Sequence, residues 1–228
     1  MEGYFTMKKI AVLIFSTLML FVIATSSLAN SVSLGYLVNG ECKTEGGAGR
    51  FTHDAMKIVL GGNYQINDKF IISSELTVCE IDASHFGGNT YDDFSYKLKG
   101  SYAIYQNDQV SFELSAGYLY LESVTQQVDS EHEYTSFTLG TDVTFYLAKK
   151  INISAGFEYG ISPDSEFRLY DLKQDNDVDS LINYQMNCNY LITKQVSLSL
   201  GYSSSCWEFK DGDKVTQSGI ITSVTYKF

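Results

Sequence analysis

Residues 182–203 read INYQMNCNYLITKQVSLSLGYS, and this stretch decides the fold. On both sides of the Thr193-Lys194 pair, large apolar residues alternate one for one with asparagine, glutamine, serine or glycine. Successive side chains of a β-strand point to opposite faces, so a period of two predicts two strands, each with one apolar and one small polar face. The short connector between them predicts an antiparallel hairpin.

The same alternation continues along the chain from Asn30 onward, without a helical apolar period. It occurs in ten segments, whose apolar faces cover residues 32–38, 56–66, 70–78, 94–104, 110–120, 137–147, 151–161, 182–192, 196–202 and 220–228. Tilted strands of roughly 9 to 11 residues are enough to cross a bilayer. We therefore expect one all-β domain over residues 30–228, with each segment spanning a membrane.

The polar face of these segments carries small residues such as Ser115, Gly140, Asn187 and Ser199. A soluble barrel or sandwich, which is the alternative, would turn a face rich in lysine and glutamate toward water. Small polar side chains instead suit a crowded, enclosed lumen, which leaves the apolar face for lipid. The sequence thus predicts that the apolar face lies on the outside.

The connectors alternate between short and long. Short ones lie at residues 67–68, 106–108, 149–150 and 193–194. Long ones lie at 41–52, 82–93, 123–133 and 162–178, with a shorter fifth at 211–213. Outer-membrane barrels have tight periplasmic turns and longer loops on the outside. We predict a closed, antiparallel, up-and-down transmembrane β-barrel of ten strands, with eight strands as the alternative.

The first residues are expected to be an export signal. Lys8 and Lys9 precede an apolar run over residues 10–24, and the small residues of Ser27-Leu28-Ala29 fit a cleavage site. This pattern is typical of a signal peptide over residues 1–29. The cleavage point lacks a cysteine, so we do not expect a lipoprotein. An uncleaved anchor is the alternative, although the run is shorter than the roughly 20 residues of a spanning helix.

Charge and cysteine content exclude several function classes. The formal net charge of −11 argues against nucleic acid as a partner. Cys42, Cys79, Cys188 and Cys206 form no C-x-x-C pair and have no histidine at metal-site spacing, so we expect neither a metal site nor a cofactor. A Cys42–Cys79 disulfide and plain thiols remain alternatives.

Charged residues on the inward-facing positions are the candidate functional group. They are Lys57, Glu75, Lys97, Lys99, Glu113, Asp142, Glu158 and Lys227. Unpaired charges in a narrow interior are costly, so a salt-bridge network that plugs the lumen is expected, with Lys99 close to Glu113. The alternative is that these charges line a narrow, wet pore.

The chain over residues 30–228 resembles the small bacterial outer-membrane β-barrels of the OmpA/OmpX-like and opacity-protein type. The resemblance rests on the export signal, on the alternating strands and on the C-terminal Val224-Thr225-Tyr226-Lys227-Phe228. It implies residence in the outer membrane among lipid and lipopolysaccharide. It also implies that Tyr226 and Phe228 form the signal read by the barrel-assembly machinery; the alternative is that they are lipid-facing aromatics only.

Function is predicted only broadly. Acids crowd into the long loops, and His53, His85 and His132 lie near the expected outer rim beside acids. Omptin-type proteases and outer-membrane lipid deacylases use histidine at such positions, but no stretch matches their motifs. We expect a non-enzymatic barrel that displays acidic surface loops and serves envelope integrity or adhesion, with a host or matrix ligand as a candidate partner. A narrow passive pore is the main alternative, and an enzyme of those two types is a further one.

Overall fold

The structure, a computed structural model, describes residues 30–47, 49–82, 90–125, 130–169, 172–176 and 178–228. The expected signal peptide, residues 1–29, lies outside the described residues. Within the described ranges, no helix is long and apolar enough to span a membrane.

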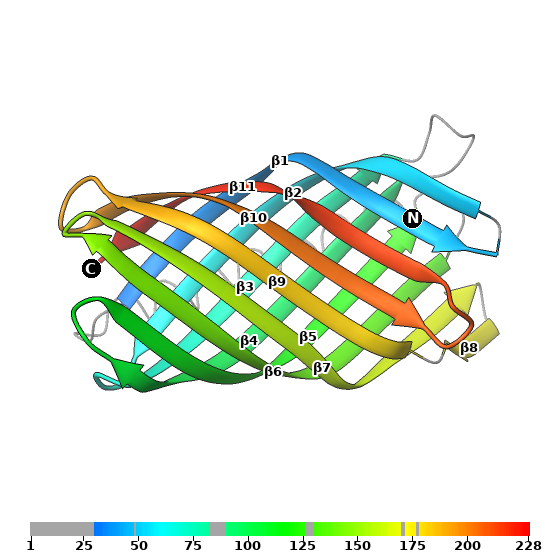
Figure 1. The fold of residues 1–228 in the computed structure, drawn as a ribbon. Coiled ribbons are helices and arrows are strands. Elements are labelled where there is room, and N and C mark those ends of the chain that lie inside the picture. Colours follow the sequence, from blue (N-terminus) through cyan, green and yellow to red (C-terminus); the bar gives the residue numbers. More distant parts are fainter. Residues whose placement is uncertain (1–29, 48, 83–89, 126–129, 170–171, 177) are drawn as a thin grey trace.

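Antiparallel strands form nearly all of the described chain. They are β1 (Asn30–Gly46), β2 (Gly49–Gln65), β3 (Phe70–Asp82), β4 (Tyr91–Gln106), β5 (Val110–Thr125), β6 (Ser130–Ala148), β7 (Ile151–Leu169), β8 (Leu172–Asn176), β9 (Val178–Leu191), β10 (Val196–Phe209) and β11 (Lys214–Lys227). All except β8 close into one barrel, because β1 pairs with β11 as well as β2, and β6 pairs with β7 (Figure 1). The ten-stranded prediction is confirmed, and the short β8 is a hairpin partner of β7 alone.

Side chains of the turn residues fix the tight turns at one end of the barrel. The Asn67 Oδ1 atom accepts hydrogen bonds from the backbone N–H groups of Lys69 and Phe70, both at 2.9 Å. Asn107 Oδ1 accepts two equivalent bonds at 2.8 Å. An asparagine that bonds its own backbone in this way starts a turn without further support. The C-terminus also lies at this end (Figure 1).

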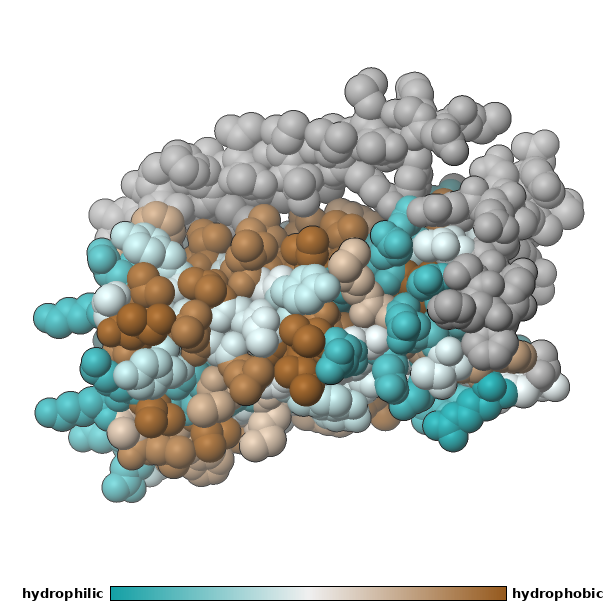
Figure 2. All heavy atoms as spheres, turned by 90° about the horizontal axis from the view of Figure 1, so that it is seen from above, coloured by the Kyte–Doolittle hydropathy of each residue, from teal (hydrophilic) through white to brown (hydrophobic). Residues whose placement is uncertain are grey.

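The apolar face lies on the outside of the barrel. Leu198, Leu200 and Tyr202 are exposed on the outer wall, whereas Ser199 lines the interior. Figure 2 shows the resulting apolar band, with hydrophilic residues gathered at both of its ends. Toward the outer end, outward positions change from apolar to charged, at Asp54, Glu80, Asp92 and Glu122. These four residues mark where the membrane-spanning part of the barrel ends.

Strand pairing continues beyond that edge, which corrects the expectation of long loops. β1 and β2 stay paired up to Gly46 and Gly49, and β5 and β6 up to Thr125 and Ser130. The alternation breaks because β1 shifts register after Leu37, where Asn39 has a positive φ of 50°. Such a bulge changes which residues face inward, so the period-two pattern ends in the sequence although the strand does not.

Candidate functional site

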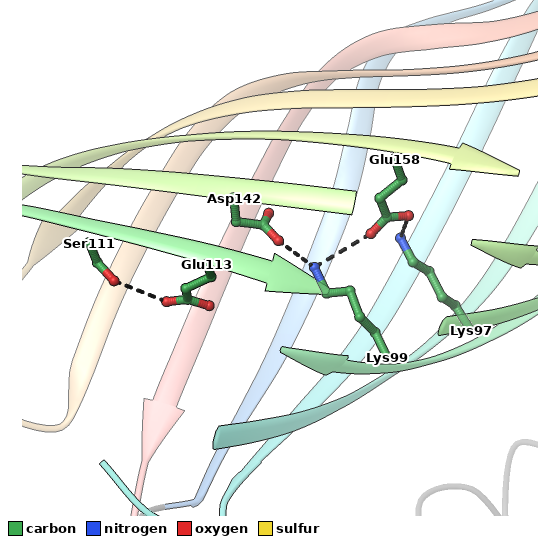
Figure 3. Close-up of polar contacts among 6 residues, drawn as sticks. All are labelled: Lys97, Lys99, Ser111, Glu113, Asp142 and Glu158. Atoms are coloured by element: carbon green, nitrogen blue, oxygen red, sulfur yellow. Dashed lines mark hydrogen bonds and ion pairs between the residues drawn. The ribbon is translucent and has the colours of Figure 1, made fainter. Parts of the chain in front are cut away.

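Four charged side chains meet inside the barrel at the level of the membrane. The Lys97 ammonium lies 2.5 Å from Glu158, and the Lys99 ammonium lies 3.0 Å from Asp142 and 3.5 Å from Glu158. The lysines come from β4, and the acids come from β6 and β7 (Figure 3). Glu158 is 6% exposed and faces two cations, so it is the centre of this ion-pair cluster.

Glycines on the intervening strands make room for the cluster. β5 lies between β4 and β6, and it places Gly117 directly opposite Lys99. A Cβ atom at Gly140 would lie 2.7 Å from the Glu158 side chain, and one at Gly156 would lie 2.5 Å from the Asp142 carboxylate. Both contacts are too close for real atoms, so only glycine leaves these acids in their present positions.

The other predicted lumen charges lie apart from this cluster. Within the described residues, Lys57, Glu75 and Glu113 form no ion pair, and Glu113 accepts a hydrogen bond of 3.3 Å from the Ser111 hydroxyl. The expected closeness of Lys99 and Glu113 is not observed, because Glu113 stands opposite Ala103 in the β4–β5 register. Glu113 is therefore two inward-facing positions nearer to the turn than Gly117, the residue that stands opposite Lys99. The acid that Lys99 contacts instead is Asp142.

Three polar chambers follow one another along the lumen. The periplasmic chamber has a volume of about 390 Å³ and includes Lys99, Glu113 and Lys227 in its lining. A middle chamber of about 290 Å³ shares Asn63, Ser73, Lys99 and Thr225 with it. An outer chamber of about 110 Å³ shares Glu75, Lys97 and Gln185 with the middle one and also touches Lys57.

The ion-pair cluster does not fill the cross-section of the barrel. It belongs to β4, β6 and β7, whereas the middle chamber is lined from the other side by Ser33, Gly35 and Ser223 on β1 and β11, and by Ser199 on β10. Small side chains on this second wall leave space beside the charges. The cluster thus lines one wall of the barrel, and the middle chamber lies next to it.

An apolar layer lies inside the outer end of the barrel, and the sequence reading missed it. It consists of two clusters of buried, inward-facing residues, Cys42, Ala55, Cys79 and Ile81 in one and Leu119, Val178, Leu181 and Trp207 in the other, together with the buried Leu37; we call these nine residues the outer apolar layer. Leu181 is 0% exposed and Trp207 is 5% exposed. Trp207 packs inward at the rim against Tyr134, with ring centroids 5.0 Å apart.

Contacts across the lumen hold this layer together. The Gln217 amide on β11 donates a hydrogen bond to Asp93 on β4. Tyr134 on β6 packs against Trp207 on β10 with the two rings tilted, and in neither contact are the two strands neighbours in the barrel. A sequence signal for the layer exists, because residues 118–121 and 35–38 are consecutive apolar or small residues without a polar face. A run that is apolar on both faces indicates a strand end whose inward side chains are buried and whose outward side chains contact lipid.

The outer rim also holds the histidines considered for catalysis. His132 lies between the outward-facing Glu131 and Glu133, above the apolar band, and its Nδ1 atom is 3.0 Å from the Tyr134 hydroxyl. Burial lowers the pKa of His132. His53 stands opposite Cys42 in the β1–β2 register, and His85 lies outside the described residues. No group of three potential metal ligands occurs among the described residues.

The cysteines are free thiols in the described structure. Cys42 and Cys79 belong to the same apolar cluster, where both are buried, and Cys188 is exposed on the outer wall. Cys42 lies between the surface residues Glu41 and Lys43, and its burial raises the pKa of the thiol to about 12.

Comparisons with known proteins bear on the fold alone. No protein-family profile and no curated protein sequence matches the chain. Among solved structures, the outer membrane protease OmpT from Escherichia coli matches at 11% identity, covering 90% of this chain and 100% of its own, with a TM-score of 0.59. An outer membrane channel from Pseudomonas putida F1 matches at 9% identity over 90% and 98% of the two chains, with a TM-score of 0.52. The chain has the fold of the small outer-membrane β-barrels.

The location of this outer-membrane barrel follows from its fold and from its lipid-facing band. Tyr226 and Phe228, the expected assembly signal, are 41% and 56% exposed on the outer wall. Their rings meet edge to face at a centroid distance of 5.0 Å. The barrel thus presents both aromatic residues outward, where lipid or another protein can contact them.

Proposed function

We propose that this outer-membrane barrel is non-enzymatic and closed at rest, and that it acts through the paired hairpins that project from its outer rim. The supporting observation is that β1–β2 and β5–β6 continue as ordered, paired strands beyond the last lipid-facing residues. A barrel that only had to span the membrane could end at that edge. The function that suits this shape best is adhesion or support of the envelope.

The β1–β2 hairpin illustrates the kind of surface that is displayed. Lys43 contacts Glu41 at 2.7 Å, Arg50 contacts Glu45 at 3.0 Å, and Phe51 is exposed beside them. Exposed ion pairs of this kind add at most about 1 kcal/mol of stability, so they are not needed for folding. Mixed charges around an exposed aromatic ring suit contact with lipopolysaccharide or with a host or matrix protein.

Shortening this hairpin tests the proposal. Residues 44–51 would be replaced by Asn-Gly, which joins Lys43 directly to its register partner Thr52 through a two-residue turn. We expect a folded barrel that still shifts on a gel after heating. Cells that carry it should show reduced attachment to immobilised matrix protein, or increased sensitivity to detergent and large antibiotics. The matched control replaces the Lys149-Lys150 turn by Asn-Gly at the opposite end, and it should behave as wild type.

Two results would count against the proposal. Wild-type attachment and wild-type resistance of the shortened barrel would remove the role of this hairpin. Peptide cleavage or lipid deacylation by the refolded protein, lost in His132→Ala, would establish an enzyme instead. The assembly-signal interpretation is tested separately by Phe228→Ala, which should slow insertion by the assembly machinery more than the equally lipid-facing Phe137→Ala does.

A further inference from the structure

We propose that the barrel holds a pathway for small cations that is shut only at the outer apolar layer, and that this layer is a dewetting gate. The pathway consists of the three polar chambers, which share lining residues from the periplasmic end upward. This goes beyond the proposed surface function, since it assigns the interior an activity of its own when the gate opens.

The chambers form a polar route past the ion pairs. Lys99 lines both the periplasmic and the middle chamber, and Lys97 lines both the middle and the outer one. In the proposed pathway, water and ions pass along the serine-rich wall while Lys97 and Lys99 stay bound to Glu158 and Asp142 on the other side. Breaking these ion pairs is not required for conduction.

The top of the outer chamber is different in character. Leu37 on β1 and Leu119 on β5 line it from separated strands and are 3% and 7% exposed. Above them lie the other members of the outer apolar layer, including Trp207. A narrow passage with apolar walls expels water, and an ion cannot enter it without losing its hydration shell. This layer is the step at which the pathway closes.

Charges near the gate favour cations. Apart from the residues of the ion-pair cluster, the charged residues that line the outer chamber are two acids, Glu75 and Asp93, and one base, Lys57. Asp93 is 4% exposed, borders the chamber and accepts a hydrogen bond from the Gln217 amide. Opening of the layer lets water reach this carboxylate. An ionised Asp93 beside the outer apolar layer would attract cations and repel anions.

Planar-bilayer recording of the refolded full barrel tests the gate, with Leu37→Ser and Leu119→Ser as opening variants, singly and together. Serine replaces an apolar wall with a hydroxyl that can hold water. We expect at least a tenfold rise in the frequency of single-channel steps over wild type. Leu200→Ser is the matched control, because Leu200 is 58% exposed on the lipid face, and it should stay as quiet as wild type. A gel shift on heating establishes that every variant is folded.

Further variants separate the gate from the ion pairs and test selectivity. Lys99→Met should leave the barrel quiet; steps in this variant that equal those of Leu37→Ser/Leu119→Ser would place the gate at the ion pairs and overturn the proposal. In a KCl gradient the opened barrel should show a cation-selective reversal potential, and adding Asp93→Asn should move that potential toward zero. Silence of the folded Leu37→Ser/Leu119→Ser barrel would also refute the gate. A steady conductance of the wild-type barrel would instead refute the part of the proposed function that says the barrel is closed at rest.

Discussion

The ion-pair cluster makes Glu158→Gln the most informative test of what stabilises the barrel interior. This change keeps the size of the side chain but removes the charge that both Lys97 and Lys99 face, at 2.5 and 3.5 Å. Removing one partner of a buried ion pair costs about 3–5 kcal/mol, because the remaining charge is left without compensation. The polar chambers beside both lysines allow some rehydration, so we expect the lower end, about 3 kcal/mol.

The chain contains one tryptophan, and Trp207 lies in the outer apolar layer, so its fluorescence reports directly on unfolding. Urea unfolding in lipid vesicles would give the change in free energy. The control is Glu113→Gln, whose described contact is the 3.3 Å hydrogen bond from Ser111, and it should change stability by less than about 1 kcal/mol. Equal losses in the two variants would refute the assignment of Glu158 as the centre of the cluster.

Further predictions concern packing and thiol protection. Gly156→Ala should lower stability by about 1–3 kcal/mol because its Cβ overlaps a carboxylate, whereas Gly47→Ala, with open space around it, should be neutral in the same urea assay. Leu181→Ala, at a fully buried site, should cost about 2–5 kcal/mol, and a loss under about 1 kcal/mol would mean that the outer apolar layer is loosely packed. In a variant whose other two cysteines are serine, Cys42 and Cys79 should resist iodoacetamide at pH 9 until the barrel is unfolded. Because burial raises the pKa of Cys42 from 9.0 to about 12, its contribution to stability should be present below pH 9 and lost between pH 9 and 12.

The membrane-spanning part of the fold could be read from the sequence because two simple constraints act there. Lipid outside and a crowded lumen inside enforce the alternation seen in residues 182–203, and tight turns at Asn67 and Asn107 set the strand order. Above the membrane these constraints end. The bulge at Asn39 shifts the inward face of β1 by one residue, so the end of this paired strand was expected to be a loop.

The interior was harder to predict, because it depends on contacts between distant strands. The sequence showed that Lys97, Lys99, Asp142 and Glu158 point inward, but not that lysines from β4 reach past β5 to acids on β6 and β7. That reach depends on the absence of side chains at positions such as Gly140. Leu37 and the other members of the outer apolar layer were missed, because runs that are apolar on both faces, such as residues 118–121, were interpreted through their outward-facing residues alone.

The seam between β1 and β11 has a consequence for how the molecule matures. The ion pairs join β4, β6 and β7, which follow one another along the chain, so they can form on an open, curved sheet. The Gln217–Asp93 bond joins β11 to β4, and the shorter path between these strands around the barrel crosses the β1–β11 seam, so this bond needs the complete circle. The contacts at the outer end of the barrel should therefore form last during insertion. A barrel whose insertion stops before that step would let ions leak across the membrane.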